Sequence, residues 1–119
     1  MRKWKPIFIE NSWVPKVLSF FTPISIGAIT LGIVVFSRGV MDDRTRQHET
    51  IHFQQFLETM FIGFLVLYCY DYVRGLIKYK DGTRAYYNIR AEQEAYAQEQ
   101  TLNYLEYRTR WQWIRGYRI

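Results

Sequence analysis

The stretch His48-Glu49-Thr50-Ile51-His52 contains both histidines of this 119-residue chain and is an instance of the pattern HExxH. On an α-helix, residues four apart lie on one face about a turn apart, so the two imidazoles can share a single Zn²⁺ ion. Glu49 points to a neighbouring part of the surface, where its carboxylate can reach a metal-bound water. The pattern therefore predicts a helical metal site in which the histidines hold the ion, the ion acidifies a water and Glu49 takes the proton.

The composition predicts a single domain over residues 1–119, with a core of modest size. Hydrophobic residues make up 49% of the chain and aromatic residues 18%, which suits both a small core and a membrane interface. The net charge of +5 is compatible with an anionic membrane surface or an acidic partner. No helix-turn-helix, zinc-knuckle or Gly/aromatic RNA-binding pattern occurs, so we expect no nucleic acid partner.

The cysteine content and the N-terminus bear on where the protein resides. Cys69 is the one cysteine, so a disulfide-stapled secreted fold is not expected. It lies in an apolar run and is expected to be a small buried side chain. Pro6, Glu10 and Pro15 interrupt the basic N-terminus, which does not resemble a signal peptide. We expect a cytoplasmic protein, or one that is peripheral to or embedded in the inner membrane.

Residues 17–36 carry no charge over 20 positions and allow two interpretations. By length and hydropathy the segment meets the criterion for a transmembrane helix. Pro23 and two glycines disfavour a regular helix, however, and the many β-branched residues favour strands. We therefore expect a buried β-hairpin over about residues 24–37, with strands near 24–30 and 33–37. An edge strand beside the metal site could then bind an extended peptide by strand addition.

Three helices are expected after the hairpin, over about residues 44–59, 60–79 and 85–110. Asp42 or Asp43 can cap the first of them, which carries HETIH. The second is strongly apolar only over its first eleven residues, too few to span a bilayer, and suits a buried or interfacial helix. Its two inner charges, Asp71 and Arg74, can pair with each other. The predicted fold class is α+β and mostly helical.

The chain ends in RTRWQWIRGYRI, residues 108–119, which mixes four arginines with aromatic residues. This segment could bind a membrane surface or an acidic partner. The simpler interpretation is a solvated tail that is docked by its tryptophans.

The two histidines require a third protein ligand, because a catalytic zinc site usually has three and a water. The last expected helix offers the carboxylates of Glu92, Glu94 and Glu99. Along this helix, mostly small and apolar side chains fall on one face: Ala91, Ala95, Gln98, Leu102 and Leu105. Helical geometry alone does not choose among the three carboxylates: Glu94 lies on one flank of this face, slightly nearer its centre, and the other two lie on the opposite flank. Gln55, one turn beyond His52, could contact the site from behind or be a solvated glutamine.

The segment NIRAEQEAY, residues 88–96, resembles the second motif of gluzincin metallopeptidases of the CAAX-prenyl-protease and HtpX heat-shock-protease type. That motif reads approximately N-x-x-F-E-x-x-A-D, and its first glutamate is the third zinc ligand. Asn88, Glu92 and Ala95 match the motif, whereas Ala91 replaces its aromatic residue and Tyr96 its aspartate. The resemblance implies a minimal zincin-like core in which Glu92 is the third ligand.

Over nearly its full length, the chain also resembles a group of short proteins encoded by bacteria and their phages. The shared elements are NSWVPK, SRG, HETIHFQQ, YKDG and EQEAY, in that order. This resemblance names a group without assigning a substrate.

These features predict a metallopeptidase that acts on a peptide or protein, with one Zn²⁺ per chain. His48, His52 and Glu92 would hold the ion, with Glu94 as the alternative third ligand. Glu49 would act as general base and then pass the proton to the leaving amine. Tyrosines that could stabilise the oxyanion are Tyr96, Tyr86 and Tyr87.

Other interpretations remain open. The same ligand set suits Fe²⁺ or Mn²⁺ as well as zinc. The chain could also be a catalytically inactive zincin-like module for binding or structure, with zinc as a folding staple, or a small membrane-associated protein. The oligomeric state does not follow from the sequence.

Overall fold

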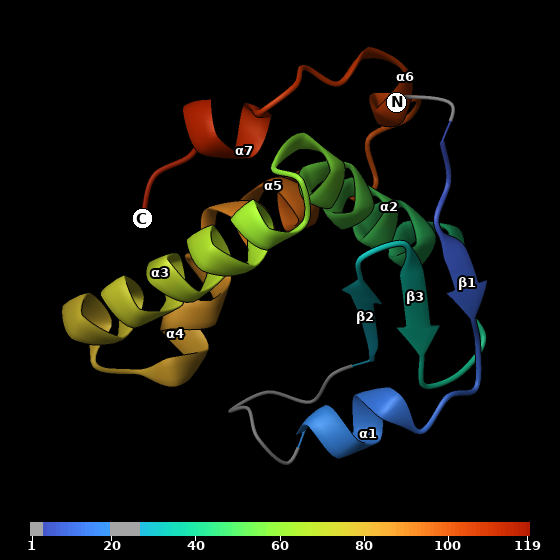
Figure 1. The fold of residues 1–119 in the computed structure, drawn as a ribbon, viewed down its shortest axis with the longest axis horizontal. Coiled ribbons are helices and arrows are strands. Elements are labelled where there is room, and N and C mark those ends of the chain that lie inside the picture. Colours follow the sequence, from blue (N-terminus) through green and yellow to red (C-terminus); the bar gives the residue numbers. More distant parts are fainter. Residues whose placement is uncertain (1–3, 20–26) are drawn as a thin grey trace.

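The computed structural model describes residues 4–19 and 27–119, and within these ranges it is a mostly helical α+β chain with a three-stranded sheet at one side (Figure 1). The strands are β1 (Ile7–Ile9), β2 (Ala28–Leu31) and β3 (Val34–Ser37). The helices are α1 (Val14–Ser19), α2 (Asp43–Glu58), α3 (Ile62–Tyr79), α4 (Gly82–Tyr87), α5 (Arg90–Gln98), α6 (Tyr104–Tyr107) and α7 (Gln112–Arg115). The predicted α+β, mostly helical class is confirmed.

The predicted hairpin is formed by β2 and β3, which pair antiparallel with Leu31 opposite Val34. Gly32 and Ile33 make the turn between them. Gly32 has a positive φ of 68°, whereas Ile33 is outside the left-handed region. A glycine with positive φ at the first of two turn positions is typical of a type II′ turn, whose twist suits a hairpin.

The alternative of a transmembrane helix over residues 17–36 is contradicted by the two strands that occupy its second half. Residues 20–26, which include the predicted start of the first strand, lie outside the described residues. In the part of the chain that the structure describes, no single helix has the length and apolar character needed to cross a bilayer. The α2–α3 pair meets that test only when taken together, and it is bent by 112°.

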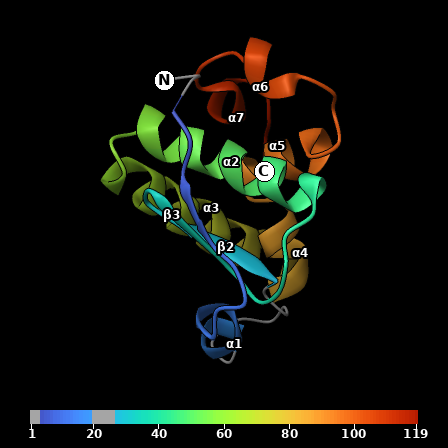
Figure 2. The ribbon, with the colours of Figure 1, turned by 90° about the vertical axis from the view of Figure 1, so that its right-hand side faces the viewer.

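The sheet places β2 beside the helix that carries HETIH. Among the described strands β3 is central, with β1 parallel to it on one side and β2 on the other. One face of this sheet packs on α2, where Val35 and Ser37 are buried and the Thr30 hydroxyl donates a hydrogen bond of 3.0 Å to the Glu49 carbonyl. Figure 2 shows the strands alongside α2. The edge of the described sheet therefore borders the HExxH helix.

The boundaries of the first two predicted helices agree with the structure to within two residues. Asp42 is the cap of α2, and its carboxylate accepts a hydrogen bond of 2.8 Å from the Thr45 amide. After α2, Met60 and Phe61 both lie in the left-handed region, which few residues other than glycine adopt. This double turn sends α3 away from α2 at a steep angle.

The prediction of one helix over residues 85–110 is wrong. The segment is broken at Asn88–Ile89 and again between α5 and α6. At the first break Ile89 is extended, and Asp71 of α3 accepts the Arg90 amide at 3.1 Å and its guanidinium at 2.8 Å. A carboxylate from another helix thus satisfies a free N–H group at the start of α5. Asp71 pairs with Arg90 instead of forming the predicted pair with Arg74.

Close packing joins α4 to α3 and α7 to the core. A Cβ at Gly75 would lie 3.0 Å from Cα and Cβ of Ala85, so the glycine lets α4 lie directly on α3. Trp113 of α7 is fully buried against a cluster that includes Phe56 and Phe64, as predicted for a tail docked by tryptophan. The expectation that Cys69 is buried is wrong, because it lies on the exposed side of α3.

We expect Asp71→Ala to lower the free energy of unfolding by about 2–3 kcal/mol, because it leaves the Arg90 amide and guanidinium without their acceptor. Urea unfolding followed by circular dichroism measures this change. The control is Asp43→Ala in the exposed first turn of α2, for which a change within about 0.5 kcal/mol is expected. Equal effects of the two substitutions would contradict a capping role for Asp71.

Candidate metal centre

Both histidines of HETIH point from α2 toward α5, where they meet one carboxylate. The Nε2 atom of His48 lies 3.2 Å from Oε1 of Glu92, and Nε2 of His52 lies 3.0 Å from the same oxygen. The side chains are 12%, 6% and 6% exposed for His48, His52 and Glu92. The structure thus brings together the three residues that the sequence suggests as ligands.

The chemistry of these donors fits a small cation. Two imidazole nitrogens and a carboxylate suit Zn²⁺, and also Fe²⁺ or Mn²⁺. In a tetrahedral zinc site with bonds of about 2.0–2.2 Å, neighbouring ligand atoms are about 3.3–3.6 Å apart, and the nitrogen-to-oxygen distances of 3.2 and 3.0 Å are close to this range. One donor atom each of His48, Glu49 and His52 also lies within 4.8 Å of the others. The two histidines, with Glu92 and Glu49 beside them, could hold a metal ion.

The opposite ring nitrogen of each histidine is held by a different residue. Nδ1 of His48 lies 3.0 Å from Oε1 of Glu99, and Nδ1 of His52 lies 2.8 Å from Oε1 of Gln55. Both oxygens can accept a hydrogen bond from the Nδ1–H group, and a neutral imidazole that donates in this way has its lone pair on Nε2, where a metal ion could bind. Metal-binding histidines are commonly oriented by such contacts.

Gln55 is held in one orientation by its own amide nitrogen. That nitrogen donates to the Ala91 carbonyl at 3.1 Å and to Oε1 of Glu94 at 2.9 Å, and the side chain is fully buried. Its oxygen must therefore face His52. Of the two interpretations of Gln55, the structure supports the contact behind the site and not the solvated glutamine.

Glu99 and Tyr96 bear on where this chain departs from the gluzincin motif. Tyr96 stands where that motif has an aspartate, and its ring lies edge-on to His48 with the ring centroids 4.5 Å apart. A carboxylate contacts His48 from Glu99, at the end of α5, which also contacts Arg44 at 3.3 Å. Glu99, one of the three candidate ligands, thus contacts a histidine on the side away from Glu92.

Tyr68 of α3 is a site residue that no spacing in the sequence singles out among ten tyrosines. Its hydroxyl donates a hydrogen bond of 2.6 Å to Oε2 of Glu92. Burial and the neighbouring charge of Glu92 raise the pKa of Tyr68, which keeps it a donor at neutral pH. Both oxygens of Glu92 are therefore engaged, one by α2 and one by α3.

Three more tyrosines lie beside the histidines. The hydroxyls of Tyr86 and Tyr96 are 2.9 Å apart, and the ring of Tyr87 packs on Tyr96 with the centroids 5.2 Å apart. Burial is the main cause that raises the pKa of both Tyr86 and Tyr96. These two phenols therefore remain protonated and can donate hydrogen bonds.

Glu94, the alternative third ligand, is not brought to the histidines. Its carboxylate is fully buried and accepts hydrogen bonds from the Tyr104 hydroxyl and from the Arg108 guanidinium. Arg108 also binds Glu58 at 2.7 and 3.0 Å. The interpretation of residues 108–119 as a solvated tail is thus wrong at Arg108, which is 3% exposed.

Glu49 and Glu92 are both buried, but their carboxyl groups differ in proton affinity. Glu49 is 3% exposed with Oε2 4.0 Å from Nε2 of His48, and burial raises its pKa against the opposing charges of His52 and His48. Burial also acts to raise the pKa of Glu92, but the charge of His52 and the hydrogen bonds of both histidines outweigh it and lower the pKa. Two carboxyl groups whose pKa values are shifted in opposite directions suit the roles of a ligand and a base.

The pKa of His52 is shifted in the direction opposite to that of Glu92. Burial acts to lower the pKa of His52, but the charge of Glu92 and its hydrogen bond outweigh that effect and raise the pKa to about 9. The cluster therefore favours a positive charge between the histidines and Glu92. A metal cation would supply that charge once the ligands are deprotonated.

A cleft of about 900 Å³ opens onto these groups, within the range of about 300–1,000 Å³ that is usual for ligand sites. Strand β2 lines one wall, and Phe64, Leu65 and Tyr68 of α3 contribute to another. The Arg38 amide donates to the Gly27 carbonyl, so residues 27, 29 and 31 direct their backbone groups toward β3. The backbone groups of Ala28 and Thr30 therefore point to the other edge of β2, which has no partner strand among the described residues.

Comparisons of the chain with protein-family models, with curated proteins and with solved structures give no match.

We expect Arg108→Ala to lower the free energy of unfolding by about 3–5 kcal/mol, because it leaves the buried carboxylates of Glu58 and Glu94 without their cation. Urea unfolding measures the loss. Arg110→Ala is the matched control, since Arg110 is exposed and lies two residues further along, and it should change the value by no more than about 0.5 kcal/mol. A small effect at Arg108 would mean that the cluster does not stabilise the fold.

Proposed function

We propose that this chain is a minimal zinc-dependent metallopeptidase with a zincin-like core, in which His48, His52 and Glu92 hold Zn²⁺. The observation that carries the proposal is the convergence of both Nε2 atoms on one oxygen of Glu92, while the opposite ring nitrogens are held by other residues. When bound, the ion supplies Lewis-acid polarisation of a carbonyl and lowers the pKa of a water to about 7.

Glu49 is the general base of the proposed reaction. Its carboxylate lies beside the ligand atom of His48 and lines the cleft, and burial raises its affinity for a proton. A base of this kind accepts a proton from the attacking water and returns it to the leaving amine. Glu49 takes this role, and not that of a ligand, because its carboxylate is 4.0 Å from Nε2 of His48 whereas Glu92 contacts both histidines.

An extended peptide is the substrate that the cleft suits best. Ala28 and Thr30 offer backbone donors and acceptors at the edge of β2, where a peptide can pair as an added strand. On the other side of the site, the hydroxyls of Tyr86 and Tyr96 lie at the cleft wall. Either can donate a hydrogen bond to an oxyanion that develops on the scissile carbonyl.

Three features favour hydrolysis over a purely structural ion. Structural zinc sites are usually closed by four protein ligands, whereas this site offers three and borders a cleft. A structural site also has no need of Glu49, a carboxylate whose burial beside the ligands is otherwise unfavourable.

The ligand set is tested by elemental analysis of protein purified without added metal. We expect about one zinc per chain in the wild type, and loss of that zinc in His48→Ala and in Glu92→Gln, because each substitution removes one of three ligands. Glu106→Gln is the control: it removes an exposed carboxylate of α6 that is not among the proposed ligands, and it should keep the metal. Zinc retained in Glu92→Gln would overturn the ligand assignment, and a wild type without metal after zinc is supplied would overturn the site.

The catalytic role is tested by Glu49→Gln, assayed on a library of quenched fluorescent peptides. We expect zinc content and the unfolding midpoint to stay unchanged while hydrolysis falls by about 10²–10⁴-fold, the usual contribution of a general base. Glu106→Gln again serves as control and should keep wild-type turnover. Full activity in Glu49→Gln would remove Glu49 as base, and a zinc-loaded wild type that cleaves no peptide would favour the binding or structural module.

A further inference from the structure

The outer face of α3 is apolar along its whole length. Ile62 and Ile77, near its two ends, are each 73% exposed, and Val66 and Val73 between them are 62% and 54% exposed. We call the full set the apolar stripe: Ile62, Leu65, Val66, Cys69, Tyr70, Val73, Leu76 and Ile77. At 3.6 residues per turn these eight positions fall within an arc of about 140°, along a helix about 27 Å long.

The opposite face of α3 already packs against the protein. Phe64, Asp71 and Gly75 are buried there, against the core cluster, Arg90 and α4 respectively. One face of helix α3 is therefore covered within the chain, whereas the apolar stripe is not. An exposed apolar face of this length marks an interaction site on most proteins.

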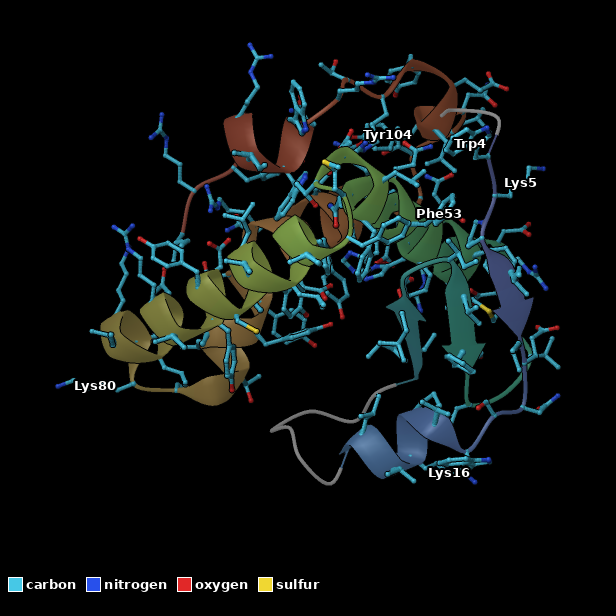
Figure 3. The ribbon with its side chains drawn as sticks, viewed as in Figure 1. Trp4, Lys5, Lys16, Phe53, Lys80 and Tyr104 are labelled. Carbon is cyan, nitrogen blue, oxygen red and sulfur yellow. The ribbon has the colours of Figure 1, made fainter. Side chains whose placement is uncertain are left out.

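Cations flank the apolar stripe. Arg74 lies on α3 next to one side of it, and Lys80 and Arg84 follow in the turn and in α4. Lys78 lies further round α3, where its ammonium donates a hydrogen bond of 3.2 Å to the Ile119 carbonyl. All four cations are exposed. Lys80 extends from the end of α3 that lies farthest from the sheet (Figure 3).

The acidic side chains near the stripe do not offset these cations. Within residues 62–88, all of which the structure describes, the acids are Asp71 and Asp81. Asp71 is buried and bound to Arg90, and Asp81 caps α4 through the Thr83 and Arg84 amides. Residues 62–88 thus carry four cations against two acids, a net positive charge on this part of the surface.

We propose that the apolar stripe docks α3 in the plane of an anionic membrane surface. An apolar helix face flanked by Lys and Arg is the pattern of interfacial helices, whose apolar side chains enter the acyl boundary while cations meet the headgroups. Tyr70, at the margin of the stripe, suits the headgroup level. A second copy of the chain fits this face less well, because it would bring the same cations and no exposed acid from α3.

The test is co-sedimentation of the full-length protein with vesicles of phosphatidylcholine alone or mixed with phosphatidylglycerol. We expect binding at least about tenfold tighter to the anionic vesicles, and weakened by salt. The double substitution Val66→Asp/Val73→Asp should reduce binding to them by at least about tenfold, because it places charge within the apolar stripe. Arg74→Glu should also weaken it, because Arg74 is the cation of α3 beside the stripe.

Leu102→Asp is the matched control, since Leu102 is 84% exposed but lies outside α3, and it should bind like the wild type. Circular dichroism checks that each variant keeps its helices. Equal binding to both vesicle types, or undiminished binding of the double variant, would overturn the proposal. A wild type that is dimeric without lipid and a double variant that is monomeric would assign the stripe to a second copy instead.

Discussion

The buried carboxylate of Glu92 is the interaction on which the rest of this structure depends. Its two oxygens join three helices, because Glu92 lies on α5 and contacts both histidines of α2 and Tyr68 of α3. A carboxylate removed from water in this way is strongly unfavourable unless a cation and hydrogen bonds compensate for it. The packing therefore favours a positive charge at the meeting point of the helices, which a protonated histidine or a bound cation can supply.

A second buried charge cluster explains why Glu92, and not Glu94, meets the histidines. The two residues are separated by one position on α5, so their side chains leave the helix in very different directions. Glu94 is held by Arg108 and Tyr104, which come from the chain beyond α5. Gln55 contacts both clusters, with its oxygen on His52 and its nitrogen on Glu94. Glu94, together with the Ala91 carbonyl, thus fixes the orientation of the amide that contacts His52.

The features of this structure that depend on neighbouring residues in the sequence could be predicted from it. The spacing of HETIH places two imidazoles on one face of α2, Asp42 caps that helix, and Gly32 allows the tight turn of the hairpin. The break before Arg90 could not be predicted in the same way, because the carboxylate that caps α5 belongs to Asp71 on another helix. Tyr68 and Arg108 share this difficulty: an apolar helix and an arginine-rich end give no sign of the buried carboxylates that they bind.

The core and the candidate site of this small protein are made from the same helix. Every residue of α2 from Glu49 to Phe56 is buried, so the turn that bears the proposed base and a proposed ligand also carries Ile51 and Phe53 into the core. In a larger protein a site can be held by a scaffold that is stable without it. Here the proposed ligands and their partners span α2, α3 and α5, and they come together only in the folded chain. A cation that binds them must therefore stabilise the fold by linkage, since the unfolded chain offers no comparable site.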